Sequence, residues 1–408
     1  MTLSLITISL VVLCWALVAA KFGQWLVSAP ILMVAAGVAV GFVMRDSVGA
    51  ALNTQTALTA AELILAVLLF VDATEVKDGL FGKSPRTAFR VLFLALPASI
   101  ALAMLMGAWL LPGLSWAVLL VIACVVVPID FAPASWIVRD KRIPARVRDT
   151  LNVEGGYNDG IASPIFVFAL VMAGDLSHEK TPWEALGTAG PATVKALIVG
   201  IGIGAVLAWA ANQAEGRNLM SEQSKRIALM AVPVLTFAVA TGISGNGFVA
   251  AFVAGIVTSY LRKSPTYERQ LELLDDISFV LGIVMWFVFG LVSVLVVFTE
   301  LGWRMLLFAL AALTVVRVVP VVLSLIGSDL TRPQRQMVGW LGPRGTTSIV
   351  FGLLAFNRLH DTDADAALTA TFYVVLGSIV VHGIAWPIAA HALPHRRPAS
   401  KSRVGTRA

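Results

Sequence analysis

The sequence predicts an all-α polytopic membrane protein, and three observations carry that prediction. Hydrophobic residues make up 58% of the 408 residues and charged residues only 13%, whereas a soluble domain carries roughly 25% charged residues. The apolar residues fall into segments close to the length of about 20 residues that crosses a bilayer. The basic residues gather in the short stretches between these segments, so the net charge of +6 indicates membrane topology and not nucleic-acid binding.

Thirteen apolar segments qualify as membrane spans or nearly do, and Gly or Pro interrupts several of them. In chain order they cover residues 3–20, 27–44, 57–76, 88–111, 115–138, 150–173, 190–213, 226–241, 246–261, 277–298, 303–326, 335–356 and 367–391. No basic stretch precedes the first segment, so we expect a retained helix and not a cleaved signal peptide. Cys14 and Cys124 both lie inside apolar segments, which argues against a disulfide framework or a Cys-based metal site.

The charges of the loops predict the orientation of these spans. With the N-terminus outside, the inside loops hold most of the Lys and Arg residues; they are 21–26, 77–87, 139–149, 214–225, 262–276, 327–334 and the tail. The outside loops 112–114 and 242–245 have no Lys or Arg, and 357–366 has three Asp residues against one Arg. Thirteen spans with the N-terminus out and the C-terminus in therefore follow the positive-inside rule.

Thirteen spans also fit a plan of two inverted six-helix repeats. If spans 1–6 and 8–13 are the repeats, they run in opposite directions, as in many transporters whose site lies at the repeat interface near the bilayer midplane. We expect residues 1–393 to form one transmembrane domain and residues 394–408 to form a basic cytoplasmic tail.

Five charged residues lie deep within apolar segments: Asp130, Glu154, Asp159, Arg317 and Arg344. A charge near the bilayer midplane costs several kcal/mol, so such residues usually face a cavity, pair with one another and carry function. Asp159 lies 11 residues after Arg148, or about 16 Å along a helix, which is close to the middle of a core of roughly 30 Å. The five charges therefore predict one buried ion site, and such a site in a membrane protein indicates a transporter.

The fifth segment predicts a broken helix. Pro128 and Pro133 bracket Asp130, and each proline removes a backbone donor and strains the helix. A broken helix at membrane depth lines a cavity or is buried in protein, and its freed carbonyls, here near Ile129, can bind a cation. A plain proline kink is the alternative, but it leaves the acid between the prolines unexplained.

The sixth segment carries the acid that we expect to do the chemistry. Glu154 and Asn158 share one helix face, as do Gly155 and Asp159, because each pair is four residues apart. The glycines Gly155 and Gly156 are expected to leave room for an ion or a water beside the carboxylate of Asp159.

The need to balance each buried charge then assigns roles to these acids. A buried Arg stays protonated and needs a permanent anion, so we expect Glu154 and Arg317 to form a structural pair. Asp159 is left without a dedicated partner, so a proton and a metal ion, Na⁺ or K⁺, compete for its carboxylate. This competition is the simplest chemistry for antiport. The alternative is that all three acids are structural counter-ions of the two arginines.

Several motifs resemble those of the bacterial NhaP-type and eukaryotic NHE-type cation/proton antiporters. The resemblance is carried, in order, by Leu69–Ala73 with its acidic Asp72, Pro128–Asp130, Arg142–Arg148, Leu151–Gly160 with its Asn158-Asp159-Gly160, Arg317, and Trp340–Gly345 around Arg344. It implies a homodimer in which a mobile core domain, about 88–173 and 303–391, moves against a dimerisation domain formed by the remaining helices. It also implies Asp159 as the ion-binding and proton-carrying residue with Asn158 beside it, electroneutral exchange, and a place in the cell (inner) membrane.

The chain departs from the family pattern beside the expected site. Ile129 replaces the family's Thr and Phe131 its Pro, and Gly155 stands where a Ser usually follows the sixth-span Glu. The choice between Na⁺ and K⁺ therefore stays open. Asp72 is expected either to line a cytoplasmic funnel or to be a solvated acid at the interface.

We expect no cofactor beyond the transported Na⁺ or K⁺ and H⁺. A proton-coupled symporter or a channel-like pathway that uses the same buried acid is the alternative function. An intramembrane enzyme is disfavoured, because no Ser/His pair or His-x-x-x-His metal site lies at a common depth.

Overall fold

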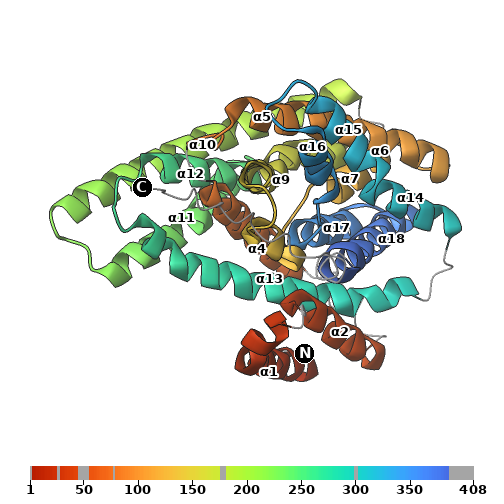
Figure 1. Ribbon diagram of the computed structural model, residues 1–408, viewed down its shortest axis with the longest axis horizontal. Coiled ribbons are helices and arrows are strands. Elements are labelled where there is room, and N and C mark those ends of the chain that lie inside the picture. Colours follow the sequence, from red (N-terminus) through yellow and green to blue (C-terminus); the bar gives the residue numbers. More distant parts are fainter. Residues whose placement is uncertain are drawn as a thin grey trace, which may run out of the picture.

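The computed structural model describes residues 2–24, 28–44, 55–76, 79–174, 181–297 and 302–385. These residues form helices joined by short loops, and no strand occurs among them. Figure 1 shows the helices packed side by side. The helical conformation lets the backbone polar groups of an apolar segment hydrogen-bond within that segment.

Helices from the first half of the chain include several that are interrupted. They are α1 (Thr2–Gln24), α2 (Ala29–Val43), α4 (Gln55–Glu75), α5 (Pro85–Arg90) continued by η1 (Val91–Ala95) and α6 (Leu96–Leu110), α7 (Trp116–Val126), η2 (Ala132–Ala134), α8 (Trp136–Arg139) and α9 (Ala145–Ala173).

The second half contains long helices followed by a series of shorter ones. They are α10 (Pro182–Gly216), α11 (Glu222–Gly242), α12 (Gly247–Leu261), α13 (Tyr267–Val297), α14 (Trp303–Leu313), α15 (Val315–Ser324), α16 (Arg332–Trp340), α17 (Thr346–Arg358), α18 (Asp361–Ser378) and η3 (Ile379–Ala385).

Each of the thirteen apolar segments falls on one helix or on consecutive helices separated by a break. Eight helices are long and apolar enough to cross a membrane, and four shorter apolar helices accompany them in the described residues. The all-helical membrane fold is therefore confirmed, whereas thirteen spans and the orientation stay predictions. The expected tail, 394–408, and the end of the last segment lie outside the described residues.

The helices form two groups with α4 and α9 between them. In Figure 1, α10, α11 and α12 lie at one end, while α6, α14, α15 and α18 lie at the other. The long helix α13 runs along one edge, with α1 and α2 on its outer side. Helices α2 and α13 pack closely because each has a glycine at the contact. A Cβ on Gly37 of α2 would collide with the carbonyl of Phe287, and a Cβ on Gly290 of α13 would collide with the carbonyl of Val34.

The basic turn between α8 and α9 is held by its own charges. Arg142 donates to both carboxylate oxygens of Asp140, with Nε 2.8 Å from Oδ2, and this hydrogen bond lowers the pKa of the Asp140 carboxyl. Arg148 donates to the carbonyls of Ile143 and Val138. These bonds fix the turn from which α9 starts, and α9 carries the acids of the candidate site.

A candidate ion site at the crossing of broken helices

Two extended stretches cross inside the helical group. Helix α7 ends at Val126 and the chain is not helical again until η2, while α16 ends at Trp340 and α17 starts at Thr346. The amide of Asp130 donates to the carbonyl of Pro343 at 3.0 Å, so the two stretches hydrogen-bond to each other. Pro128 lies in the first stretch and Pro133 in η2, where their missing amide hydrogens remove helix bonds.

Asp130 neutralises the positive end of a helix. Its carboxylate accepts the amide of Ala132 at 2.7 Å and that of Thr346, the first residue of α17, at 2.5 Å. Gly345 lets the carboxylate approach, because a Cβ there would lie 2.5 Å from Asp130 Oδ2. A carboxylate at a helix N-terminus is stabilised by the free amides and the helix dipole. The carboxylate of Asp130 is therefore held at the crossing by its hydrogen bonds to backbone amides.

Arg344 neutralises the negative ends of two other helices. It is fully buried, and it donates from Nε to the carbonyl of Val126, the last residue of α7, at 2.5 Å. It also donates to the carbonyls of Gly342 and, at 3.5 Å, of Ala312 near the end of α14. A cation at helix C-termini satisfies carbonyls that have no helical donor, and among the described residues the guanidinium of Arg344 hydrogen-bonds to backbone carbonyls and not to an acid side chain.

The break between α14 and α15 at Thr314 was not among the expectations from sequence. The segment 303–326 has its proline at Pro320, inside α15, and not at the break. Thr314 instead adopts φ −119° and ψ −91°, which ends α14 at Leu313. Arg344 donates a hydrogen bond to the carbonyl of Ala312 near this interruption, and so supplies a donor to a backbone oxygen at the end of α14.

Glu154 and Arg317 form a buried bidentate ion pair. Both terminal nitrogens of Arg317 donate to the Glu154 carboxylate, with Nη2 2.9 Å from Oε2, and Nη2 also donates to the carbonyl of Val338 at 3.2 Å. Each side chain is 5% exposed. Gly342 makes space for the guanidinium, because a Cβ there would lie 2.5 Å from Nε. The pair thus joins α9 to α15 beside the crossing.

Asp159 is the buried acid without a partner. It is 2% exposed, and neither carboxylate oxygen has a hydrogen-bond partner among the described residues. Asp130 and Arg344 lie close enough to interact with it electrostatically, and the hydroxyl of Thr347 lies near it as a potential hydrogen-bond donor. The side chain amide of Asn158 donates to the carbonyl of Ile129 at 2.9 Å, while its Oδ1 is also buried without a partner. The crossing therefore brings together unpaired oxygens of a carboxylate and an amide.

The expectation that Gly155 and Gly156 leave room for an ion is wrong. A Cβ on Gly155 would lie 2.6 Å from Cε2 of Phe131, and one on Gly156 would lie 2.6 Å from Cγ2 of Val76 and 2.8 Å from the carbonyl of Asp72. The glycines admit an aromatic ring and helix α4 because close packing fills the space beside α9. Sequence reasoning noted Phe131 as a departure from the family pattern but missed its contact with Gly155, since the two residues lie in different segments.

Asp72 lies on α4 and is half-buried, with its backbone carbonyl against Gly156 of α9. It interacts electrostatically with Asp130 and Asp159. This position places a third carboxylate near the crossing, and its role in a funnel stays a prediction.

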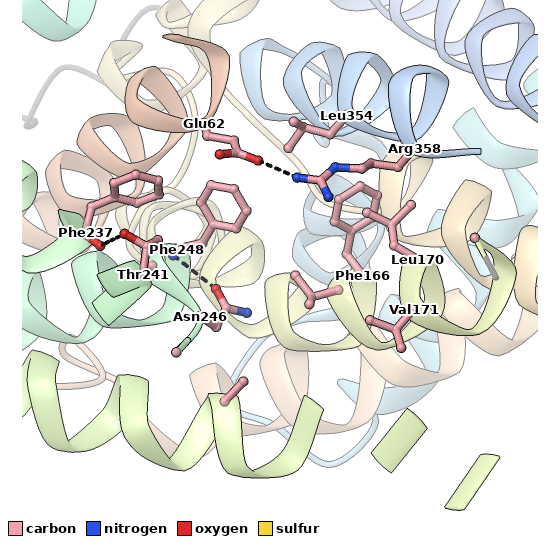
Figure 2. A pocket seen from close by; sticks show the side chains of 15 residues that line it. Glu62, Phe166, Leu170, Val171, Phe237, Thr241, Asn246, Phe248, Leu354 and Arg358 are labelled. Atoms are coloured by element: carbon pink, nitrogen blue, oxygen red, sulfur yellow. Dashed lines mark hydrogen bonds and ion pairs between the residues drawn. The ribbon is translucent and has the colours of Figure 1, made fainter. Parts of the chain in front are cut away.

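Two cavities flank Asp159 along α9. One of about 480 Å³, here called the Glu62 cavity, is lined by four residues of α9 from Phe166 to Val171, by Gly174, and by residues of α4, α10, α11, α12 and α17. Figure 2 shows Glu62 of α4 and Arg358 of α17 facing each other there, and their ion pair measures 3.3 Å. The other, of about 360 Å³ and here called the Tyr157 cavity, is lined by Tyr157 of α9 and by residues of α4, α12 and α13. The two cavities lie on opposite sides of Asp159 in the sequence of α9.

Comparison with known proteins gives a consistent result across the chain. Residues 6–391 match the family described as "Sodium/hydrogen exchanger, transmembrane". The chain is 24% identical to a K(+)/H(+) antiporter NhaP2 of Shewanella sp. (strain MR-4) over 388 residues, which is 92% of this chain and 65% of that protein. It is 24% identical to a Na(+)/H(+) antiporter of Schizosaccharomyces pombe over 357 residues, 79% of this chain and 74% of that protein.

A solved structure has the same fold. The sodium proton antiporter MjNhaP1 from Methanocaldococcus jannaschii at pH 8 superposes with a TM-score of 0.77 over 96% of this chain and 99% of its own, at 18% sequence identity. The sequence motifs, the crossing of broken helices and the match over residues 6–391 all indicate the same family. The chain belongs to the sodium/hydrogen exchanger family of transmembrane proteins, the family of the NhaP-type and NHE-type cation/proton antiporters.

Proposed function

We propose that this chain is a secondary active monovalent cation/proton antiporter that exchanges Na⁺ or K⁺ for H⁺ at Asp159. The observation that carries the proposal is the buried carboxylate of Asp159 with both oxygens unpartnered, while Asp130 and Glu154 are bound to helix amides and to Arg317. Burial disfavours an unpaired negative charge, and either a bound proton or a bound cation relieves it. One site that holds one species at a time produces obligatory exchange.

Electroneutral one-for-one exchange is part of this proposal. Asn158 is neutral and its amide is bound to the Ile129 carbonyl, so Asp159 is the acid that changes charge state at this point of α9. One proton replaces one monovalent cation on one carboxylate, and the net charge of the loaded site stays the same. An imposed membrane potential is therefore expected to leave the exchange rate unchanged.

Alternating access is proposed to open the two cavities in turn. The Glu62 cavity and the Tyr157 cavity lie on opposite sides of Asp159, and both lie between α9 and helices α4 and α12. Helix α9 belongs to the core (88–173 and 303–391), and α4 and α12 belong to the dimerisation domain. We propose that these two parts move relative to each other. The Glu62–Arg358 ion pair joins the two parts at the Glu62 cavity. We further propose that the protein works as a homodimer in the cell (inner) membrane.

Ion-dependent proton flux in proteoliposomes tests the function. When Li⁺, Na⁺ or K⁺ is added outside acid-loaded vesicles, antiport moves protons out and restores the fluorescence of a quenched pH dye. A symporter would move protons in with the cation and deepen the quench, and a channel would produce current that follows the membrane potential. Absence of cation-driven proton flux at every pH tested would contradict the proposal.

The choice of cation is proposed to depend on the contact between Phe131 and Gly155. The relatives' names include both K(+)/H(+) and Na(+)/H(+) antiporters, so they support no single ion. Gly155→Ser restores a hydroxyl one turn from Asp159, but its Cβ would lie 2.6 Å from the Phe131 ring. We expect this variant alone to be overpacked, with a loss of about 1–3 kcal/mol of stability.

The double variant Gly155→Ser with Phe131→Ala removes that collision. Its melting temperature in detergent is expected to rise above that of Gly155→Ser, and the ratio of its apparent KM values for Li⁺, Na⁺ and K⁺ is expected to differ from that of Phe131→Ala alone. The same ratio in both variants would mean that a hydroxyl at position 155 is not a ligand in this protein.

A further inference from the structure

Ser163 of α9 has an unusual environment for a helical serine. It is fully buried, and its hydroxyl has no hydrogen-bond partner in the described parts of the chain. Hydroxyl side chains inside helices commonly donate to the carbonyl four residues earlier, as Thr236 does to Val232 at 2.7 Å and Ser293 to Phe289 at 2.6 Å. A buried hydroxyl without a partner carries a desolvation penalty, so the oxygen of Ser163 is free to bind a ligand that reaches it.

Pro164 frees a second oxygen in the same turn. Helix α9 continues from Ala145 to Ala173 with Pro164 inside it. A proline has no amide hydrogen, so the carbonyl of Gly160, four residues earlier, loses its helical donor. Helix carbonyls point along the axis toward the C-terminus, which directs the Gly160 carbonyl toward the turn of Ser163. The unpartnered carboxylate of Asp159 is adjacent in sequence.

Ser163 also lies on the face of α9 that leads to the Glu62 cavity. Val167, Leu170 and Gly174 line that cavity, and they follow Ser163 by 4, 7 and 11 residues, which is the spacing of one helix face. Figure 2 shows Leu170 directed into the cavity. Asp159 precedes Ser163 by four residues and therefore lies one turn deeper on nearly the same face. A cation that moves between Asp159 and the Glu62 cavity along this face passes Ser163.

We propose that the Ser163 hydroxyl is a ligand of the transported cation on the Glu62-cavity side of Asp159, assisted by the Gly160 carbonyl. This inference rests on the proposed antiport at Asp159 and adds a residue that determines cation affinity and selectivity. Carboxylate, carbonyl and hydroxyl oxygens are the ligands that hard cations prefer. A proton on Asp159 needs no such set of oxygens, so Ser163 favours the cation-loaded state over the protonated one.

The test is Ser163→Ala in proteoliposomes, with Ser99→Ala as its matched control. Ser99 of α6 is 2% exposed and its hydroxyl also has no partner, so its removal reports what the loss of a buried serine hydroxyl does elsewhere in the chain. We expect Ser163→Ala to raise the apparent KM for the cation about tenfold or more, the effect of losing one bond to a charged group. The increase is expected to be the same at each pH and to differ among Li⁺, Na⁺ and K⁺. Ser99→Ala is expected to keep the KM values and their ratio.

Ser163→Cys gives a second measurement in which the side chain is replaced and not removed. Sulfur is larger than oxygen and is a poor ligand for hard cations, so this variant is also expected to raise the apparent KM. Stabilisation by added cation in detergent, read as a shift in melting temperature, measures binding without transport and is expected to weaken in both Ser163 variants.

The outcomes separate this inference from the proposed function. Wild-type exchange with KM values that neither Ser163 variant changes would overturn the role of Ser163 and leave antiport at Asp159 intact. Equal increases in KM for all three cations, with unchanged cation-dependent stabilisation, would also overturn it, because a ligand contributes to binding. A wild-type protein without cation-driven proton flux would overturn the proposed function itself.

Discussion

Asp159→Asn is expected to abolish cation/proton exchange, reducing the cation-driven flux to that of empty liposomes. Asparagine has nearly the same shape as aspartate, but its amide neither carries a transported proton nor supplies the negative charge that balances a cation. Asp130 and Glu154 are already bound to helix amides and to Arg317, so neither replaces it. Dye dequenching across Li⁺, Na⁺ and K⁺ at several pH values measures the loss.

The fold of Asp159→Asn is expected to stay intact. Its wild-type oxygens make no hydrogen bond among the described residues, so neutralising the side chain removes a buried charge without breaking a contact. The melting temperature in detergent is therefore expected to equal or exceed that of the wild type. Asp276→Asn, at an exposed position of α13, is the matched control and keeps wild-type flux. Exchange retained by Asp159→Asn would refute its role as the ion-binding residue.

Glu154→Gln is expected to have the largest effect on stability, a loss of about 3–5 kcal/mol, because it leaves the guanidinium of Arg317 buried without its anion. The wild-type pair is bidentate and each side chain is 5% exposed, so water compensates little of the charge. A large fall in the melting temperature in detergent is the expected measurement. An unchanged melting temperature would show that this pair does not hold α9 to α15.

The double variant Glu154→Gln with Arg317→Met separates the lost anion from lost packing. When both charges are removed and the volume is kept, a buried pair is often replaced at little loss or even with a gain in stability. The double variant is therefore expected to melt well above Glu154→Gln, by an interaction energy that a double-mutant cycle measures. A double variant that is no more stable than the single one would place the effect of Glu154→Gln in packing and not in charge.

These two expectations differ because two acids on one helix have opposite surroundings. Glu154 lies one turn before Asn158 and is bound to Arg317 of α15, whereas Asp159 has no bound cationic partner among the residues described. Loss of the first is expected to lower stability, and loss of the second is expected to lower transport. Flux and melting temperature measured on the same preparations therefore distinguish a structural acid from an ion-carrying one.

The amino-acid sequence is enough to predict the helical membrane fold and the helix that carries the candidate ion site. The bilayer excludes water, so a spanning chain shows its helices as apolar segments and its interruptions as prolines. For the same reason charges such as Asp159 and Arg344 stand out in those segments, because placing them there is costly. Charge accounting along one chain also pairs Glu154 with Arg317, and those side chains are in contact in the structure.

The neighbours of each of these residues are set by how the helices pack together. The spacing along a helix shows which residues share a face, but not which neighbour that face meets. The Phe131 ring against Gly155, α4 against Gly156, and Arg344 on the carbonyls of α7 and α14 all join segments that lie far apart in the chain or differ in direction. Such contacts depend on how each helix is rotated and where it is broken, and close packing of all segments together sets both. The same packing placed Ser163 between Asp159 and the Glu62 cavity, a position that the sequence Ser163-Pro164 alone does not reveal.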